Sequence, residues 1–453
     1  MPKISVAETL AEKIVALKPG SLPAPTARKC ADLLIDVVGL CVTARNEDYV
    51  ASALAGWDDD GPCTTIGHAR RLSATGAAFV NGTAAHGEDF DDTFEGGPVH
   101  AGAVVVPAVL AACERHNPDG RLALIGIAVG CEVLCRLSLV VPKAVHKAGF
   151  HPTAVFGAMG AAAGVGVALG LNAKQIVDAL GIAGSMAGGI IEYLAEGAWT
   201  KRLHAGWAAQ SGIRAALLAR NGFVGPRTVF EGVHGLFHGF AHTTKGDYDA
   251  LIGDFGSRWV TDTLAFKPYP CGTMAQPYID CARRLAARGV KPEDVTELVC
   301  EVAEGTVHRL WEPLADKQKP RNGYAAKFAV PYLLATGFVH GGVGLGAFTQ
   351  NAILDARVLA LAAKVKFVID PDNPYPNNYT GHIRATLKDG SVIEERQPYL
   401  RGGAQEPLTR QDVTDKFALN AQHGGWSKTQ SDVALKLMAG LYAGKIDLSA
   451  LQS

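Results

Sequence analysis

The segment from His86 to His100 concentrates ionisable side chains: it holds two histidines and five acids, and an apolar run that predicts a buried helix follows it. Carboxylates beside a buried helix must be paired, hydrogen-bonded or protonated, because taking an unpaired charge out of water is costly. Two interpretations are open at this point. Asp91, Asp92 and Thr93 could cap the helix by accepting its unpaired backbone N–H groups, or the segment could be part of an active site.

Basic side chains gather in three further segments. His151 stands before a proline and a small-residue helix, and Lys267 lies in the run Phe-Lys-Pro-Tyr-Pro. Three basic groups, Lys201, Arg202 and His204, fall within four positions. Lysines are usually solvated at the surface, but the apolar neighbours of Lys201 and Lys267 argue against that here. Ammonium groups can neutralise the charge that develops on a carboxylate when a proton is removed from the carbon beside it.

Together these four segments resemble the MmgE/PrpD family, which includes 2-methylcitrate dehydratase, cis-aconitate decarboxylase and iminodisuccinate epimerase. The resemblance spans nearly the whole chain, from the amino-terminal helix to the closing segment 408–417. It implies a mostly α fold, in which a large all-helical domain carries an inserted, smaller α+β lid domain. It also implies a homodimer, a small anionic carboxylate as substrate, no cofactor and no metal.

The resemblance implies roles for five catalytic residues. Lys201 and Lys267 match the family's paired active-site lysines, one from each domain, and would bind the substrate's carboxylates. His151 and His100 match its histidines, one of which would shuttle the proton, since imidazole titrates near neutral pH. Asp89 matches its acid, and would orient or tune that histidine, or protonate a departing hydroxyl if burial raised its pKa.

Four more residues are candidates for substrate binding. Thr93 matches a family hydroxyl. Tyr332 matches a family tyrosine on the lid side and would donate a hydrogen bond to the substrate. A structural role, with a packed ring and a hydroxyl that reaches water, fits it equally well. Arg202 and His204 lie close to Lys201 in sequence, but a helix would turn them to different sides, so they are expected beside the site rather than in it.

A hydro-lyase reaction is the main prediction, with elimination of water from a 2-methylcitrate-like hydroxy acid. Residues 94–97 and 271–276 lack histidines that many relatives carry, so the specificity loops differ from those of the named dehydratase. The enzymatic alternatives are decarboxylation of a cis-aconitate-like acid and epimerisation of an iminodisuccinate-like diacid. A carboxylate-binding protein that has kept the fold without the chemistry is the alternative of another class.

Bulk properties narrow the classes of partner. The formal net charge is −1, so no overall field attracts nucleic acid or an anionic membrane. The nine cysteines form no C-x-x-C pair and no set for an iron–sulfur cluster, as expected of reduced thiols in a cytoplasmic protein. The apolar stretch 154–171 approaches membrane-spanning length, but its glycines and alanines favour a buried helix. The glycines among the histidines of 233–242 favour a loop over a metal site.

The 453 residues exceed the size of one hydrophobic core, so two domains are expected. Helical periodicity dominates the first part of the chain, where Asn172 and Gln175 form a capping-box pattern. Alternating apolar residues predict four strands, at 295–303, 364–369, 381–387 and 391–395. An Asp-Gly pair between the last two is a strong hairpin signal. The predicted domains are a helical domain over 1–264, an α+β lid domain over 265–402, and helices over 403–453 that return to the first domain.

Overall fold

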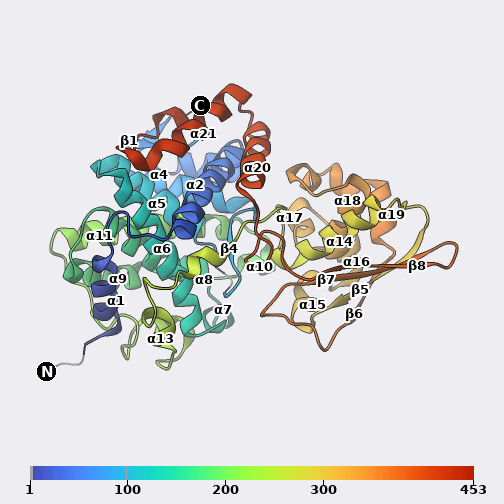
Figure 1. Cartoon of the computed structure of the whole chain (residues 1–453), viewed down its shortest axis with the longest axis horizontal. Coiled ribbons are helices and arrows are strands. Elements are labelled where there is room, and N and C mark those ends of the chain that lie inside the picture. Colours follow the sequence, from blue (N-terminus) through green and yellow to red (C-terminus); the bar gives the residue numbers. More distant parts are fainter. Residues whose placement is uncertain (1–3, 98, 453) are drawn as a thin grey trace. The chain divides into compact units, whose positions relative to one another are not determined.

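The computed structural model describes residues 4–97 and 99–452 (Figure 1). The chain divides into two compact units, the first formed by Met1–Leu264 with Thr409–Ser453 and the second by Ala265–Leu408. Helices account for 57% of the residues and the sheets are small. The mostly α fold class predicted from the sequence is thereby confirmed.

Unit 1 is built mainly from helices, whose bounds are α1 (Val6–Ala16), α2 (Ala24–Ala44), α3 (Asp48–Ala55), α4 (Ala74–Gly87), α5 (Gly102–His116), α6 (Gly120–Val140), α7 (Ala144–Lys147), α8 (Pro152–Ala168), α9 (Ala173–Met186), α10 (Tyr193–Glu196), α11 (Thr200–Arg220), α12 (Leu236–Ala241), α13 (Tyr248–Ile252), α20 (Arg410–His423) and α21 (Lys428–Gly440). The predicted capping box of α9 is confirmed: the Asn172 side chain accepts the Gln175 N–H, and the Gln175 side chain accepts the Asn172 N–H, each at 3.0 Å.

Helix α8 forms the core of unit 1 and is buried along nearly its whole length. It contacts α5, α6, α9 and α11, and small residues permit these contacts, since a Cβ on Gly164 would lie 2.5 Å from the carbonyl oxygen of Gly126 in α6. Helix α11 approaches α4 in the same way, because a Cβ on Gly206 would collide with the carbonyl of Phe79. This close approach sets the start of α11 against the end of α4.

Unit 1 is not all-helical, which corrects the prediction. β1 (Asp60–Thr64) pairs antiparallel with β2 (Arg71–Leu72). The residues of β1 are Asp-Gly-Pro-Cys-Thr, which lack apolar alternation and so give no strand signal. The histidine run 233–242 is not a loop throughout either, because part of it forms α12. Leu236 and Phe237 are buried there, and their packing outweighs the low helix propensity of the glycine that follows.

Helix α6 is long and apolar enough to cross a membrane, the one such helix among the described residues. Of its most apolar window, 89% is buried within the structure. The stretch 154–171, which approached that length in the sequence, forms the shorter α8.

Unit 2 contains a four-stranded sheet in the order β6-β5-β7-β8 (Figure 1). Its strands are β5 (Val295–Val302), β6 (Val365–Ile369), β7 (Gly381–Leu387) and β8 (Val392–Gln397). β5 pairs parallel with β6 and antiparallel with β7, and β7 and β8 form the predicted hairpin. All four strands appear within two residues of their predicted bounds, because alternating burial is a local property of a sheet with one covered face. Two further strands of two residues lie outside this sheet: β3 (Thr93–Phe94) belongs to unit 1, and β4 (Leu264–Ala265) is where the chain passes from unit 1 to unit 2.

Helices of unit 2 are α14 (Gln276–Ala287), α15 (Val307–Leu310), α16 (Leu314–Gln318), α17 (Gly323–Ala326), α18 (Val330–His340) and α19 (Ala356–Ala362). α14 packs against β7 and β8 on one side and against α18 on another. Residues 325–339 do not form one helix, although their pattern is helical, because the chain breaks between α17 and α18. Pro331 starts the second helix, where a missing N–H is tolerated.

The C-terminal helices hold the loop that follows α4. Lys416 of α20 donates to the carbonyl oxygen of Phe90 at 2.7 Å, and its Nζ lies 2.7 Å from Oδ1 of Asp36 in α2. The ammonium also lies over the Phe90 ring, 3.9 Å from its centroid. Lys416 is 7% exposed and Asp36 1% exposed, so this ion pair is buried. Phe90 stands between Asp89 and Asp91, and the ion pair therefore anchors the acid-rich loop.

Replacing Lys416 with methionine will lower the free energy of unfolding by about 3–5 kcal/mol, because it takes a cation from beside a buried carboxylate. Lys428→Met in α21 is the matched control. Lys428 pairs with Asp432, and both side chains are exposed, so its loss should stay within about 1 kcal/mol. Urea denaturation followed by circular dichroism measures both variants. Equal losses would contradict the anchoring role of Lys416.

Candidate active site

The loop between α4 and α5 carries the acids that stand out in the sequence. The carboxylate of Asp92 accepts the backbone N–H of Ala101 at 3.0 Å and of Gly102 at 2.9 Å, at the start of α5. The helix-cap interpretation is thereby confirmed for Asp92. Burial, and then repulsion from Asp91, raises the pKa of Asp92 to about 7. Asp92 thus serves mainly to hold the start of α5 in place.

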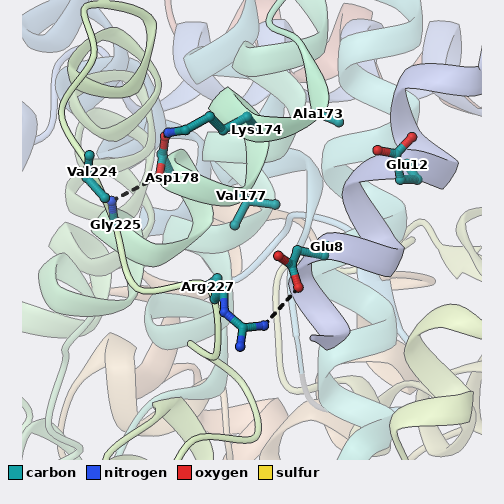
Figure 2. Close-up of a pocket in the computed structure, with 9 residues that line it drawn as sticks. All are labelled: Glu8, Glu12, Ala173, Lys174, Val177, Asp178, Val224, Gly225 and Arg227. Atoms are coloured by element: carbon teal, nitrogen blue, oxygen red, sulfur yellow. Dashed lines mark hydrogen bonds and ion pairs between the residues drawn. The ribbon is translucent and has the colours of Figure 1, made fainter. Parts of the chain in front are cut away.

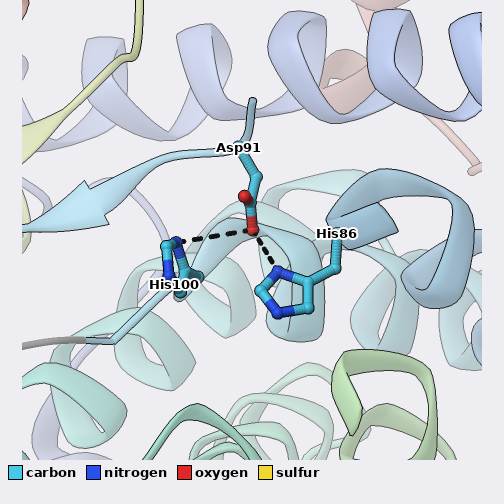
Figure 3. A group of neighbouring side chains, drawn as sticks. All are labelled: His86, Asp91 and His100. Carbon is cyan, nitrogen blue, oxygen red and sulfur yellow. Dashed lines mark hydrogen bonds and ion pairs between the residues drawn. The ribbon is translucent and has the colours of Figure 1, made fainter. Parts of the chain in front are cut away.

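Asp91 faces two histidines instead (Figure 3). Its Oδ2 lies 2.6 Å from Nδ1 of His86 and 3.6 Å from Nδ1 of His100. The same nitrogen of His100 lies 2.7 Å from the carbonyl oxygen of Asp92 and 3.4 Å from the hydroxyl of Thr93. The structure thus brings the predicted residues His100 and Thr93 together, and adds His86 and Asp91 to them.

Four imidazoles from four elements form a histidine cluster. His86 lies in the last turn of α4, His100 precedes α5, His151 is the residue just before α8, and His204 lies near the start of α11. Ring centroids are 5.0 Å apart for His86 and His100, 5.6 Å for His86 and His151, and 5.3 Å for His151 and His204. Tyr193 of α10 packs edge-on against His151 and His204. The histidine cluster lies wholly in unit 1, so the fold of that unit assembles it.

His151 and His204 are joined through their Nδ1 atoms, which are 3.1 Å apart, so one nitrogen donates and the other accepts. Burial, followed by unfavourable electrostatic interactions with His86, His204 and Lys201, lowers the pKa of His151 well below its ordinary value. Burial, followed by His86 and Lys201, lowers the pKa of His204 to about 4. Both imidazoles are therefore neutral at neutral pH and are able to accept a proton.

Replacing His204 with asparagine will make the protein less sensitive to acid. The folded-state pKa of about 4 lies below the ordinary 6.5, so between these values the unfolded chain binds more protons at His204 than the folded chain does. The stability linked to this group is fully present above pH 6.5 and is lost as the pH falls through the folded pKa, at about 1.4 kcal/mol per pH unit. The variant lacks this loss.

Urea denaturation of wild type and His204→Asn at about pH 7 and about pH 4.5 measures the effect. We expect the variant to gain about 2–3 kcal/mol relative to wild type at the lower pH. The same difference at both pH values would show that His204 titrates normally in the folded protein.

Lys201 forms a buried ion pair with Asp89. The two residues are 6% and 3% exposed. The backbone of Asp89 has φ +54°, in the left-handed region that residues other than glycine rarely adopt. Such strain persists only where the surrounding structure imposes it, and it often marks functional sites. The predicted lysine and the predicted acid are therefore brought together, in a conformation that the fold maintains at a cost.

Helix α11 presents Lys201 and His204 on one face, since they are three residues apart. The charge of Lys201 acts on both His151 and His204, which places the ammonium beside the histidine cluster. Arg202 lies elsewhere: its guanidinium stacks over the ring of Tyr49, 4.3 Å from the centroid. His204 thus contacts the cluster directly, contrary to the position beside the site that the sequence suggested, whereas Arg202 does not share its face.

Lys267 and Tyr332 belong to unit 2, and both are buried. The hydroxyl of Tyr332 donates to the carbonyl oxygen of Ala347 at 2.6 Å, so its proton is already used within that unit. The roles of Lys267 as a second carboxylate clamp and of Tyr332 as a hydrogen-bond donor stay predictions.

His86, Asp91 and His100 have the residue types of a metal site, and they are the one group of three such ligands within 4.8 Å among the described residues. Their hydrogen bonds fit a metal poorly. Nδ1 of His100 faces the carbonyl oxygen of Asp92, which can only accept, so this nitrogen carries a proton. Nδ1 of His86 is engaged by Asp91. The trio is therefore better described as a hydrogen-bonded arrangement than as a set of metal ligands.

A separate pocket lies between α1, α9 and residues 224–227 (Figure 2). Four of its five charged residues pair with one another: Arg227 with Glu8 at 3.0 Å, and Lys174 with Asp178 at 2.7 Å. No member of the histidine cluster lines it among the described residues. Paired surface charges offer little for proton transfer, so the histidine cluster is the candidate active site.

Three members of the site received no catalytic or binding role from the sequence: His86, Asp91 and Tyr193. His86 opens the acid-rich segment, but its separation of five residues from Asp91 spans the end of a helix and matches no periodic pattern. Tyr193 sits in a helix of four residues and has no motif around it. Its place against two imidazoles is a property of packing alone.

Comparisons with known proteins agree on one family. The MmgE/PrpD N-terminal domain matches residues 8–249 and the MmgE/PrpD C-terminal domain matches residues 269–438. Human cis-aconitate decarboxylase is 30% identical over 436 residues, which cover 92% of this chain and 88% of the human protein. A cis-aconitate decarboxylase-like protein of Aspergillus oryzae is 26% identical over 439 residues, covering 92% of this chain and 90% of the fungal one. The mitochondrial 2-methylcitrate dehydratase of Yarrowia lipolytica is 25% identical over 256 residues, covering 50% of this chain and 45% of its own. The chain belongs to the MmgE/PrpD family, as its sequence predicted.

Proposed function

We propose that the protein is a cofactor-independent lyase that decarboxylates a small unsaturated tricarboxylic acid of the cis-aconitate type. The observation that carries the proposal is the pairing of a buried lysine with a cluster of neutral, buried imidazoles, Lys201 beside His151 and His204. A cation for a carboxylate and a group that carries a proton are the two requirements of this reaction. The relatives named as cis-aconitate decarboxylases or as decarboxylase-like match 87–92% of the chain, against 50% for the dehydratase, and they favour decarboxylation over the dehydration predicted from the sequence.

The chemistry of the substrate defines what each residue must do. Cis-aconitate carries one carboxylate on a methylene carbon and one on each carbon of its double bond. When the methylene carbon loses its carboxylate as carbon dioxide, the freed electron pair forms a new double bond to the central carbon. The displaced π electrons take a proton at the far carbon, so the product is a dicarboxylic acid with a terminal alkene. Negative charge builds up on the carboxylate of that far carbon before the proton arrives.

Lys201 is suited to stabilise this charge. In the protein without substrate the ammonium of Lys201 pairs with the carboxylate of Asp89. A substrate carboxylate would compete with Asp89 for the ammonium, and the low polarity of the buried site strengthens the attraction.

His151 is suited to deliver the proton. Burial and the neighbouring imidazoles and lysine hold its pKa low in the protein without substrate, and a bound trianion would raise that pKa, so that the ring takes up a proton. The ring then gives this proton to the far carbon and recovers another from solvent. His204, hydrogen-bonded to His151, fixes which nitrogen of His151 bears the proton that is transferred.

Dehydration of a 2-methylcitrate-like acid is the second candidate, because the match to 2-methylcitrate dehydratase covers half of the chain. It uses the same lysine and imidazole but requires an acid for the departing hydroxyl. Asp89 is buried and lies beside Lys201, which makes it the residue to test for that role.

Proton NMR of the purified protein in D2O with cis-aconitate, citrate and 2-methylcitrate separates the candidates. Decarboxylation gives carbon dioxide and a terminal alkene with one deuterium on the neighbouring methylene carbon. Water loss from citrate or 2-methylcitrate, with every carboxyl retained, would replace the proposal by dehydration. Deuterium in recovered substrate without net loss would indicate epimerisation or a related exchange, and tight binding without turnover would indicate a carboxylate-binding protein.

A further inference from the structure

Asp91 and His86 form a buried pair that the proposed reaction does not yet use. Both side chains are completely buried, and Oδ2 of Asp91 lies 2.6 Å from Nδ1 of His86. His86 lies in the last turn of α4 and Asp91 follows on the loop that Lys416 anchors through Phe90. The position of this pair is therefore set by two helices and a buried ion pair, and not by chance contact on a mobile surface.

The proton on His86 can be assigned from its partner. A carboxylate accepts hydrogen bonds, so Nδ1 of His86 is the donor and carries the proton. The other ring nitrogen, Nε2, is buried and has no hydrogen-bond partner among the described residues. Buried polar nitrogens without a partner are rare in folded proteins and call for an explanation. Figure 3 shows this nitrogen on the side of the ring turned away from Asp91.

The ring of His86 also touches the proposed proton carrier. It stacks on His151 with a centroid separation of 5.6 Å and an interplanar angle of 21°. It lies 5.0 Å from the ring of His100, whose Nδ1 is 3.6 Å from the same oxygen of Asp91. A single carboxylate oxygen is thus close to two imidazoles, and one of these imidazoles supports His151.

We infer that Asp91 is a positioning residue of the active site, which fixes His86 in the Nδ1-protonated form and thereby holds the ring on which His151 packs. The inference rests on the proposed function only for its kinetic consequence, because the protonation of His86 is a property of the protein without substrate. A buried carboxylate sets the orientation and the tautomer of the imidazole whose N–H it accepts.

Asp91→Asn removes the charge and keeps the shape. Asp92→Asn is the matched control, because Asp92 is the next residue and is equally buried. Its carboxylate accepts backbone N–H groups at the start of α5 and makes no hydrogen bond with His86 among the described residues. With the acid that the protein turns over, Asp91→Asn should lower kcat by about 10- to 100-fold and leave KM within about threefold, since no substrate contact is lost. The kcat of Asp92→Asn should fall by less than about threefold where the variant folds.

A double-mutant cycle tests whether Asp91 acts through His86. If it does, Asp91→Asn combined with His86→Gln will lower kcat no further than His86→Gln alone. Multiplicative losses would show that the two residues act separately and would overturn the inference, as would equal kcat values for Asp91→Asn and Asp92→Asn.

Nitrogen-15 NMR of histidine-labelled protein reads the tautomer directly, without any substrate. We expect the His86 signals, assigned by their loss in His86→Gln, to show a proton on Nδ1 in wild type and a changed Nδ1 signal in Asp91→Asn. A His86 proton on Nε2 alone would overturn the inference even if the protein is an active decarboxylase. If none of the acids is turned over, the proposed function fails, and this measurement still decides the role of Asp91.

Zinc titration of the full-length protein tests the remaining alternative, in which His86, Asp91 and His100 are metal ligands. Weak binding that is unchanged by Asp91→Asn agrees with a hydrogen-bonded pair. Stoichiometric zinc that is lost in Asp91→Asn would show that His86, Asp91 and His100 are metal ligands, and would overturn the positioning role.

Discussion

Lys201→Ala will lower kcat/KM for the acid that the protein turns over by at least about 100-fold, because the charge that develops on the reacting carboxylate then lacks its buried cation. Lys201 is 6% exposed, and its field is correspondingly stronger than that of a solvated lysine. Lys174→Ala in α9 is the matched control, since Lys174 is exposed and pairs with Asp178 outside the histidine cluster. Steady-state kinetics at saturating and limiting substrate measures both variants.

The loss of Lys201 also leaves Asp89 buried without its cation, which destabilises the fold by about 3–5 kcal/mol and complicates an activity assay. The double variant Asp89→Asn/Lys201→Met removes both charges and should recover much of that stability, since a neutral pair of similar volume carries no desolvation penalty. We expect it to fold and to stay inactive. A folded double variant with more than about a tenth of wild-type kcat/KM would sink the role assigned to Lys201.

His151→Gln will lower kcat by about 100- to 10,000-fold, the usual contribution of a positioned acid or base. His151 should also give a thermodynamic signal, which is the uptake of a proton when a polyanion binds. Burial and neighbouring positive charge hold the pKa of His151 well below its ordinary value in the protein without substrate. A bound polyanion reverses the sign of the local potential and raises that pKa, so binding should take up a proton near neutral pH.

Isothermal titration calorimetry with a non-reacting tricarboxylate, in two buffers of different ionisation enthalpy, counts the protons taken up. We expect uptake of up to about one proton in wild type and markedly less in His151→Gln. His234→Gln is the control, because His234 is exposed and lies outside the histidine cluster. Equal uptake in wild type and His151→Gln would assign the proton to another group.

Local pattern was enough to predict most of the secondary structure. The four strands of the unit 2 sheet and the capping box at Asn172 follow from residues that are neighbours in sequence. The two elements that the sequence did not predict, β1 and α12, also have local physical causes. β1 has no apolar alternation because its outer residues are exposed, and α12 forms because Leu236 and Phe237 are buried by the surrounding helices.

The site was predicted less completely, and the reason differs for each residue. Asp89, Thr93, His100, His151 and Lys201 stand in segments with recognisable composition, and unit 1 gathers them. His204 lies in the histidine cluster and not beside it, because a spacing of three residues on a helix brings two side chains to the same face. Lys201 and His204 share such a face, and Arg202 stacks on Tyr49.

The sequence by itself determined the family, the helical and strand-forming segments, and the types of side chain available for proton transfer and carboxylate binding. Only the tertiary structure decided that His86, His100, His151 and His204 stack within one cluster, and that Asp91 faces histidines while Asp92 caps α5. The physical reason is that pKa values, tautomers and ion pairs depend on distance through space and on exclusion of water. For residues more than 50 positions apart in the chain, such as the hydrogen-bonded His151 and His204, both are set by how the helices pack.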